Sequence, residues 1–134
     1  MSEKRFQLEV VTPNRVVVQE EVEIVIAPGS EGEFGVLAGH CPFITTLKIG
    51  SLMYRQDGET HLMTVMGGFA EVTPSKMVVL VELAERAEEL DLERAKTAQH
   101  QAEEQLAKTV TEAERVQAHK RLAKALVRQK VASS

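Results

Sequence analysis

The fold of this chain is decided by the stretch VVLVELAERAEELDLERAKTA, residues 78–98, in which the hydrophobic pattern changes its period. The stretch begins with the apolar, mostly β-branched run VVLV of residues 78–81, a composition that favours a β-strand. It continues into Ala, Glu, Arg and Leu, which have high helix propensity, and residues 84–131 contain neither Gly nor Pro. We therefore expect two domains, a β domain over residues 1–84 and a helical domain over residues 85–134.

Before this stretch, short apolar runs alternate with turn signals. Asp57-Gly58 is a strong signal for a β-hairpin, because both central positions of such a turn adopt positive φ. Pro13-Asn14 and a loop at residues 28–32 separate other runs. We expect strands at residues 6–11, 15–19, 22–26, 43–47, 51–55, 61–66, 69–72 and 77–81. Short strands separated by turns predict an antiparallel sandwich or barrel.

The helical half divides into two segments, each with an apolar stripe at three- to four-residue spacing. The stripes comprise Ala95, Ala98, Ala102 and Leu106, then Ala118, Leu122, Ala125 and Leu126. Asp91 is the expected N-cap of the first helix. The pattern resets at Thr109 and Glu112, a capping-box spacing, and Thr111 and Glu114 have the same spacing. A short break between two helices predicts an antiparallel hairpin.

Both stripes are rich in alanine. Because the gain from burial scales with apolar area, burying Ala stabilises a helix pair much less than burying Leu or Ile. A helical hairpin whose seam, the contact between its two apolar stripes, is made mostly of alanine should be marginally stable alone. We expect it to dock on another surface and to be able to leave that surface.

The composition indicates a globular protein without a nucleic-acid partner. The chain has 134 residues, of which 43% are hydrophobic and 27% charged, and its net charge of −4 gives no basic surface for nucleic acid. The lone Cys41 cannot form an internal disulfide, so we expect a reducing compartment. The apolar runs are far shorter than the roughly 18 residues that span a bilayer. We expect no targeting segment, because residues 1–5 lead directly into an alternating strand pattern.

No pair or cluster of residues predicts a catalytic site. His40 and Cys41 are adjacent, but adjacent side chains of an extended segment point to opposite faces, so we do not expect a nucleophile–base pair. The other histidines lack a second ligand at metal-site spacing. Gly67-Gly68-Phe69 is not followed by the Gly-Lys-Ser/Thr of a phosphate loop. We expect a bulge or a close backbone approach there instead.

Charge is divided unequally between the two helical segments. Residues 88–108 are mainly acidic and residues 112–131 mainly basic. Arg121, Lys124 and Arg128 fall on one helical face. Two interpretations remain open: a solvated face that pairs with its acidic neighbour, or a docking stripe for an acidic partner or an anion.

Three segments resemble the ε subunits of F-type ATP synthases. Residues 32–42 (GEFGVLAGHCP) are similar to their G-E-x-G-x-L-x-x-H-x-P segment, and residues 67–72 (GGFAEV) to their G-G-F-x-E-V segment. Residues 84–95 (AERAEELDLERA) are similar to their junction between sandwich and hairpin. The three segments occur in the family's order, and the likeness covers essentially the whole chain.

The resemblance implies an α+β fold, with an N-terminal antiparallel β-sandwich followed by a C-terminal two-helix antiparallel hairpin. It implies a non-catalytic rotor subunit whose sandwich packs against γ and the ring of c subunits, with Glu33 and His40 as contacts. The protein would lie at the cytoplasmic face of the bacterial plasma membrane, held there only by the complex. Its hairpin would extend along γ to the catalytic α and β subunits and restrain ATP hydrolysis. Arg121, Lys124 and Arg128 would form the basic face that meets an acidic loop of β.

The resemblance also implies a regulatory ligand rather than a required cofactor. In some bacterial members a Leu/Ile-Asp-x-x-Arg-Ala motif helps to bind one ATP on the folded hairpin. The matching residues are Leu90, Asp91, Arg94 and Ala95 in the motif, Glu85 upstream and Arg128 on the second helix. Lys124 and Gln101 stand where those members have arginine. Because Lys lacks the planar fork and Gln lacks the charge, we expect weaker ATP binding here.

A competing hypothesis is a β-sandwich adaptor that oligomerises through its helices and has no ATP synthase partners. A third, an enzyme built on His40 and Cys41, fails on the geometry of an extended segment. The adaptor would bind neither γ nor a c ring, which distinguishes it from a rotor subunit.

Overall fold

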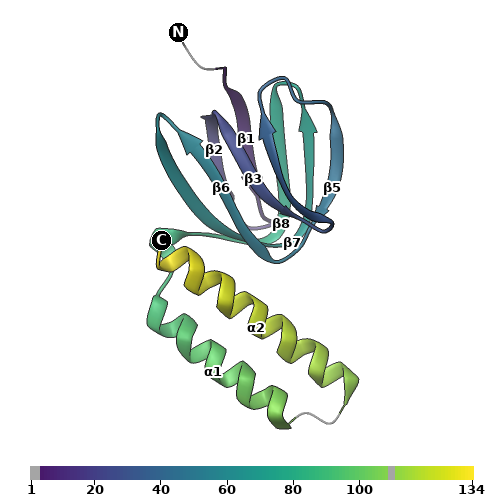
Figure 1. Ribbon diagram of the computed structural model, residues 1–134, viewed down its shortest axis with the longest axis vertical. Helices are drawn as coiled ribbons and strands as arrows, with labels where there is room; N and C mark the ends of the chain where they lie inside the picture. Colours follow the sequence, from purple (N-terminus) through teal and green to yellow (C-terminus); the bar gives the residue numbers. More distant parts are fainter. Residues whose placement is uncertain (1–3, 109–110) are drawn as a thin grey trace.

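The computed structural model describes residues 4–108 and 111–134, with the β domain above two helices in Figure 1. The described residues form, in chain order, β1 (Phe6–Val11), β2 (Val16–Val22), β3 (Ile24–Gly29), β4 (Gly32–Leu37), β5 (Phe43–Leu47), β6 (Gly50–Gln56), β7 (Glu59–Thr73), β8 (Lys76–Arg86), the 3-10 turn η1 (Ala87–Glu89), α1 (Leu92–Lys108) and α2 (Glu112–Ala132). The predicted order, a β domain followed by a helical hairpin, is confirmed.

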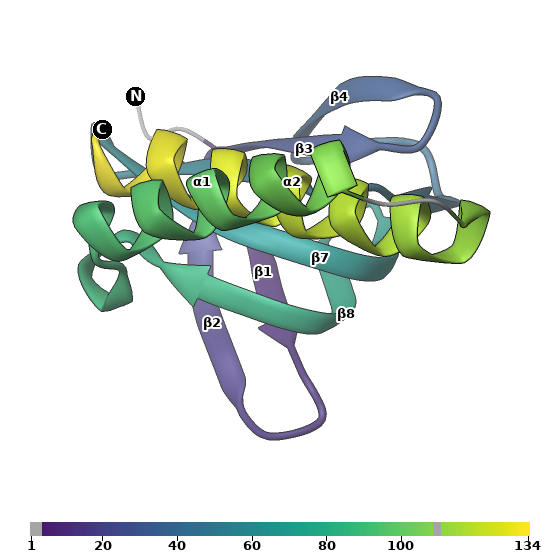
Figure 2. The ribbon, with the colours of Figure 1, turned by 90° about the horizontal axis from the view of Figure 1, so that it is seen from below.

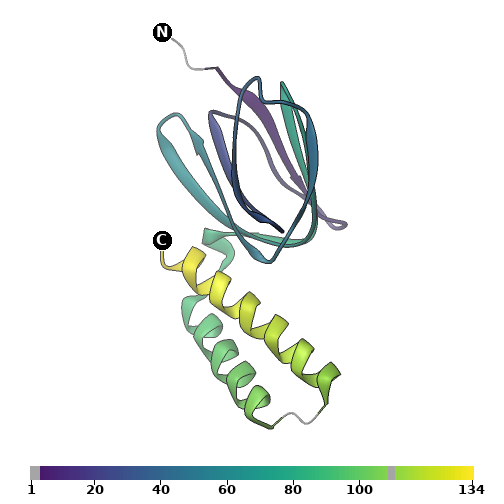
Figure 3. The same ribbon diagram turned by 45° about the vertical axis from the view of Figure 1, so that its right-hand side comes forward.

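The strands wrap around one core as a sandwich (Figures 1 and 3). Their order is β2-β1-β8-β7-β5-β3-β4, and β6 pairs with β3 and β7. The pairs are antiparallel, as predicted, except that β1 and β8 run parallel. The antiparallel prediction is wrong for this one pair. Parallel neighbours need a long crossover connection, so no local turn signal marks them in the sequence.

Strand boundaries differ from the prediction in β4 and around it. The sequence predicts no strand at residues 32–37, where β4 pairs with β3. Phe34 and Val36 of β4 face the core, but the outward positions between and after them are Gly35 and the apolar Leu37, so the sequence lacks the apolar–polar alternation of a half-buried strand. The expected loop at residues 28–32 is reduced to a turn between Gly29 and Gly32. β8 also runs on to Arg86, beyond its predicted end at residue 81.

Gly67 and Gly68 lie inside β7, so the two strands expected at residues 61–66 and 69–72 are one. The pairing with β8 keeps one register on both sides of Gly67, and the alternative of a bulge is therefore wrong. The alternative of a close backbone approach is confirmed. A Cβ atom on Gly68 would lie 2.0 Å from the carbonyl oxygen of Leu80 on β8.

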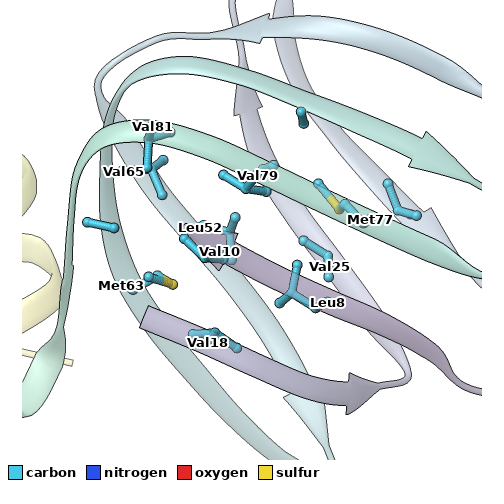
Figure 4. Packing of buried hydrophobic residues seen from close by; sticks show 14 of the residues in the cluster. Leu8, Val10, Val18, Val25, Leu52, Met63, Val65, Met77, Val79 and Val81 are labelled. Atoms are coloured by element: carbon cyan, nitrogen blue, oxygen red, sulfur yellow. The ribbon is translucent and has the colours of Figure 1, made fainter. Parts of the chain in front are cut away.

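The sandwich closes its own core, shown in Figure 4. Its largest fully buried side chains include Leu8, Leu52, Met63 and Met77. Among the described residues, neither helix contributes to this cluster. The core of the β domain therefore does not depend on the hairpin. The predicted hairpin turn at one edge is also confirmed, since Asp57 and Gly58 have φ of 51° and 80°.

The hairpin has the thin alanine seam that the sequence predicts. The buried seam side chains are Ala95, Ala102, Ala118 and Ala125. Leu126 was expected in the second stripe, but its side chain is 47% exposed, and the adjacent Val127 is buried instead. That part of the prediction is wrong because α2 packs against two surfaces, α1 and the sandwich, and the sandwich selects a different face of the helix.

Both helices begin at side-chain caps. The Oδ1 atom of Asp91 accepts hydrogen bonds from two backbone N–H groups of the first turn of α1, at 3.0 and 3.2 Å. The Oγ1 atom of Thr111 accepts from the N–H of Glu114 at 3.1 Å. These two predicted caps are confirmed. The other capping-box spacing begins at Thr109, which lies outside the described residues.

The hairpin docks on one end of the sandwich through α2. Met66 of β7 and Val127 and Val131 of α2 form a separate buried cluster, the docking patch. Partly buried apolar side chains surround it, namely Ile49, Leu62, Leu83, Ala87 and Leu90. Figure 1 shows α2 between the sandwich and α1, and Figure 2, seen from below, shows both helices crossing this end of the sandwich. The surface on which we expected the hairpin to dock is therefore the chain's own sandwich.

The close approach at Gly68 gives a stability test. We expect Gly68→Ala to lower the free energy of unfolding by about 3 kcal/mol, because the new methyl group would force β7 and β8 apart. The matched control is Gly35→Ala in β4, where a Cβ atom would meet its nearest neighbour at 3.9 Å. That change should shift stability by less than about 1 kcal/mol. Urea unfolding followed by circular dichroism measures both, and equal stabilities would contradict the prediction.

Candidate functional site

Residues expected to bind ATP line one pocket where the sandwich meets the hairpin. Its volume is about 240 Å³. The lining residues are Glu85, Glu89, Leu90, Asp91, Arg94, Ala95, Ala98 and Arg128. They come from β8, from the connector (residues 87–90), from the start of α1 and from the C-terminal half of α2. The pocket exists only while the hairpin is docked, because Arg128 reaches it from α2.

One ion pair joins the two domains at the wall of this pocket. Arg128 Nε donates to Glu85 Oε1 at 2.9 Å, and the side chains are 29% and 20% exposed. Glu85 Oε1 also accepts from the hydroxyl of Thr64 at 3.1 Å, and the Glu85 N–H donates to that hydroxyl at 3.0 Å. Thr64 is fully buried in β7. The sandwich therefore holds Glu85 in place to receive Arg128, and we call this pair the clamp.

The ATP-motif residues Asp91 and Arg94 lie at the rim of the pocket, on the first turn of α1. Asp91 is engaged as the helix cap through Oδ1. The Arg94 side chain is exposed. Ala95 is buried below them in the seam, where a small side chain allows α2 to approach. Asp91 caps α1 and helix-forming residues follow it, so the local sequence determines where α1 begins and thereby where this side of the pocket lies.

The rest of the predicted basic and ATP-contacting set lies outside the pocket. Lys124 is half-buried one turn before Arg128 on α2 and does not line the pocket. Gln101 lines a separate surface depression toward the other end of the hairpin. Arg121 donates from Nη1 to Gln105 Oε1 on α1 at 2.7 Å. In the docked hairpin, Arg128 alone of the three basic residues reaches the pocket.

Sequence reasoning missed a second ion pair beside the pocket. Arg15, from the turn between β1 and β2, contacts both carboxylate oxygens of Glu89, at 2.7 and 2.9 Å. Two hydrogen bonds hold the pKa of the Glu89 carboxyl below its ordinary value. The larger effect comes from the Arg15 guanidinium and the smaller from the backbone N–H of Arg86. The pair therefore contributes stability at neutral pH that is lost only as the pH falls through that lowered pKa. No local signal connects Arg15 to a partner 74 residues away.

The charges around the pocket nearly balance. Its lining carries three carboxylates, on Glu85, Glu89 and Asp91, and two guanidinium groups, on Arg94 and Arg128. Arg15 neutralises Glu89 from outside. The volume is below the roughly 300–1,000 Å³ of typical small-molecule sites. A small polar group fits such a pocket, and a larger ligand would extend along the hairpin surface.

The described part of the chain offers little for other chemistry. Within residues 4–108 and 111–134, no group of three or more His, Cys, Asp or Glu side chains could hold a metal ion. Within the same ranges, no helix is long and apolar enough to cross a membrane. His40 Nδ1 lies 2.9 Å from the carbonyl oxygen of Cys41. The imidazole is therefore engaged with the backbone of its neighbour rather than poised beside the thiol.

Glu33 and His40 do not form one site. Glu33 is exposed at the beginning of β4, and His40 follows the end of the same strand. Four residues of strand between Glu33 and Leu37 span about 13 Å. The His40 ring packs against Phe43, with centroids 5.1 Å apart. The two residues therefore belong to opposite ends of the strand.

An exposed apolar row crosses the outer face of the sandwich. Val16 on β2 lies opposite Val11 on β1, Val11 opposite Leu80 on β8, and Leu80 opposite Phe69 on β7. Val16, Leu80 and Phe69 are 55%, 39% and 38% exposed. A groove of about 580 Å³ follows the row. The run VVLV of residues 78–81 is the sequence signal for this row. It makes both faces of β8 apolar, although only one face meets the core.

In a comparison with known proteins, both domains match models of the same family. A model of the ATP synthase delta/epsilon chain beta-sandwich domain matches residues 5–87, and one of the delta/epsilon chain long alpha-helix domain matches residues 88–133. The ATP synthase epsilon chain of Nitratidesulfovibrio vulgaris strain DP4 is 49% identical over 129 residues, 96% of each chain. That of Syntrophobacter fumaroxidans is 47% identical over 132 residues, 98% of each chain.

Solved structures agree with these matches. A chain in the Euglena gracilis mitochondrial ATP synthase structure, which contains OSCP, F1 and the c-ring, superposes with a TM-score of 0.82 at 27% identity, covering 91% of this chain and 78% of that one. A chain in the central stalk and c-ring structure of the Tetrahymena thermophila mitochondrial ATP synthase shares the fold, with a TM-score of 0.62 at 14% identity, covering 98% and 99%. With a β-sandwich domain and a long-helix domain that both match, in the family's order, this chain belongs to the ATP synthase delta/epsilon chain family.

Proposed function

We propose that the chain is the ε subunit of a bacterial F-type ATP synthase, a non-catalytic subunit of the central stalk at the cytoplasmic face of the plasma membrane. The observation that carries the proposal is the match of both domains to the family along nearly the whole chain. In this role the sandwich binds γ and the c ring and turns with them, while proton flow drives the ring. The family membership favours this role over an adaptor that oligomerises through its helices.

The apolar row supports the assignment of a γ-binding face. Contiguous exposed apolar surface of this kind is typical of a protein–protein contact. The row lies on the sandwich, and its residues take no part in docking the hairpin. The sandwich can therefore stay bound to γ whatever the hairpin does. Glu33 and His40, at opposite ends of β4, then belong to two separate contacts, Glu33 with the c ring and His40 with γ.

A single charge in the apolar row tests the proposed function. We expect Leu80→Asp to weaken binding to the purified γ subunit at least about tenfold, because it places an unpaired carboxylate in a desolvated contact. Val116→Asp is the matched control: Val116 is a comparably exposed apolar side chain, 44% against 39%, but it lies on α2. Calorimetry gives the affinities, and thermal melts check that both variants fold. Equal binding by both variants would remove this face from the γ contact.

The hairpin is the proposed regulatory part. Docked, it is held by the docking patch and the clamp; extended along γ, its basic face of Arg121, Lys124 and Arg128 meets the acidic loop of a catalytic β subunit and restrains ATP hydrolysis. The small size of the docking patch supports such an exchange. Arg128 serves both states, because it pairs with Glu85 when docked. The other two basic residues are free of the clamp, so the two states can be tested separately.

Two variants should move ATP hydrolysis in opposite directions. Glu85→Gln removes the charge of the clamp but keeps an acceptor oxygen, which should weaken the clamp by about 1–1.5 kcal/mol, the difference between a charged and a neutral hydrogen bond, so the extended state is favoured and hydrolysis falls. Arg121→Ala with Lys124→Ala leaves the clamp intact and removes up to about 1 kcal/mol per exposed charge from the extended state, so hydrolysis rises. Steady-state hydrolysis by the reconstituted complex measures both. A change in the same direction for both variants would contradict the two-state scheme.

ATP is the proposed regulatory ligand of the docked hairpin. The juxtaposition of Glu85, Asp91, Arg94 and Arg128 in one pocket supports it. The pocket would take one end of the ligand, and the remainder would lie along the hairpin toward Lys124 and Gln101. A ligand that bridges β8, α1 and α2 stabilises the docked state at the expense of the extended one.

The nucleotide proposal predicts weak and improvable binding. We expect the purified chain to bind ATP, with Gln101→Arg raising the affinity roughly ten- to a hundredfold, since a charge-assisted hydrogen bond is worth about 1.5–3 kcal/mol. Arg94→Ala should abolish binding without changing the fold, because that side chain is exposed. Calorimetry with ATP measures all three proteins. No heat from either the wild type or Gln101→Arg at millimolar ATP would restrict Asp91 to its role as a helix cap.

A further inference from the structure

The connector between the domains is fastened to the sandwich by a residue from the other end of the β domain. Arg15 lies in the turn between β1 and β2. The turn itself is fixed by Thr12, whose N–H donates to the Arg15 carbonyl at 2.9 Å and whose hydroxyl accepts from the Arg15 N–H at 3.2 Å. Thr12 is buried, with 8% of its surface exposed. The backbone from which the guanidinium extends is therefore held in place.

The guanidinium of Arg15 makes contacts on both sides of the connector's start. Its Nη2 donates to the carbonyl of Ala84 at 3.1 Å, near the end of β8. Its two terminal nitrogens also meet both oxygens of Glu89, the last residue of η1. A bidentate pair fixes direction as well as distance. Residues 84–89 are thus held at two points by one side chain.

Residues 86–90 make further hydrogen bonds that do not involve the helices. The Arg86 guanidinium donates to the carbonyl of Val17 on β2. The Arg86 N–H donates to Glu89 Oε1 at 2.9 Å, and the Leu90 N–H donates to the Ala87 carbonyl at 3.1 Å. All of these partners belong to the sandwich or to the connector itself. They would survive if the hairpin left its docking patch.

The hairpin, by contrast, is attached through α2. Its main contacts with the strands are those of α2 with β6 and β7, together with the clamp. Between η1 and α1 stand only Leu90, in an extended conformation with φ −101° and ψ 147°, and the capping residue Asp91. Residues at the ends of elements are those that absorb the backbone rotation of a hinge.

We propose that Arg15 straps η1 to the sandwich, so that the hairpin swings as one body about Leu90 and Asp91 while residues 84–89 stay with the sandwich. Arg15 is thereby a positioning residue for the swing, because it sets where α1 starts and in which direction it leaves. Without the strap the hinge would move back to the end of β8. The inference rests on the proposed function only in requiring a hairpin that can leave its docking patch.

Backbone order parameters from NMR on the isolated full-length chain locate the hinge. Val131→Asp places a charge in the docking patch and releases the hairpin. Isotope-labelled methionine methyl groups report this directly: the Met66 signal shifts on release, whereas those of Met63 and Met77, in the sandwich core, stay unchanged in a folded protein. If the Met66 signal does not shift, Val127→Asp is added as well, so that no apolar α2 side chain is left in the docking patch.

The expected result in the released variant is a sharp boundary. Order parameters of residues 86–89 should stay near the value of about 0.85 for rigid backbone, while those of Leu90 and Asp91 fall below about 0.6. Adding Arg15→Gln should lower the values for residues 86–89 as well. Arg15→Lys, which keeps the charge but not the fork, should restore them only in part. Values for residues 86–89 that drop in the released variant with Arg15 intact would overturn the proposal.

A second measurement uses the docked protein and does not depend on release. Arg15→Gln alone should speed hydrogen exchange of the Arg86 amide about tenfold or more, with the Met66 signal unchanged, because the Glu89 carboxylate that accepts that amide loses its anchor. Unchanged exchange would overturn the strap. Neither experiment includes an ATP synthase, so failure here leaves the proposed function standing, and failure of that function leaves this result valid.

Discussion

One ion pair, between Arg128 of α2 and Glu85 of β8, connects the hairpin to the sandwich at the wall of the pocket. Beside it lies the docking patch of Met66, Val127 and Val131, surrounded by partly buried apolar side chains. Burying a Val or Met side chain contributes only about 1.5–3 kcal/mol before the entropy of ordering is subtracted. A contact of that size is small enough for one charge gained or lost to matter, which is what the proposed exchange between docked and extended states requires.

The two partners of the clamp differ in how firmly they are held. Glu85 is anchored from behind by the buried hydroxyl of Thr64, on a long strand that forms part of the sandwich core. Arg128 sits on a helix whose own support is the docking patch. A ligand that enters the pocket beside the clamp must therefore interact with the arrangement of α2 relative to β8. Any such ligand has different affinities for the docked and undocked forms, which is the condition for control by population shift.

The proposed assembly face and the proposed regulatory part occupy different parts of the molecule. The apolar row runs over β2, β1, β8 and β7 on the outer face, and the sandwich core beneath it contains no helical side chain among the described residues. In the proposed function the sandwich stays in the stalk while the hairpin changes position. The turn between β1 and β2 contacts both parts. Thr12 and Pro13 border the apolar groove, and Arg15, in the same turn, holds the connector.

The sequence by itself determined the features that depend on a few neighbouring residues. The change of period near residue 84, the positive φ at Asp57-Gly58 and the caps at Asp91 and Thr111 each arise from local backbone preferences or local hydrogen bonds. The resemblance in three short segments added the family. Asp91, Arg94 and Ala95 of the ATP motif lie within four residues of one another, so their proximity in the pocket also follows from the local sequence; ATP binding by them stays a prediction.

Only the tertiary structure decided what depends on distant partners. The parallel pairing of β1 with β8, the choice of Val127 rather than Leu126 for burial and the contact of Arg15 with Glu89 all join segments far apart in the chain. The position of Lys124 outside the pocket was settled in the same way. A helix propensity or a turn signal acts over a few residues, whereas these contacts are selected by how whole elements fit together. The amphipathic pattern of α2 fits either face, and the surface against which it packs makes the choice.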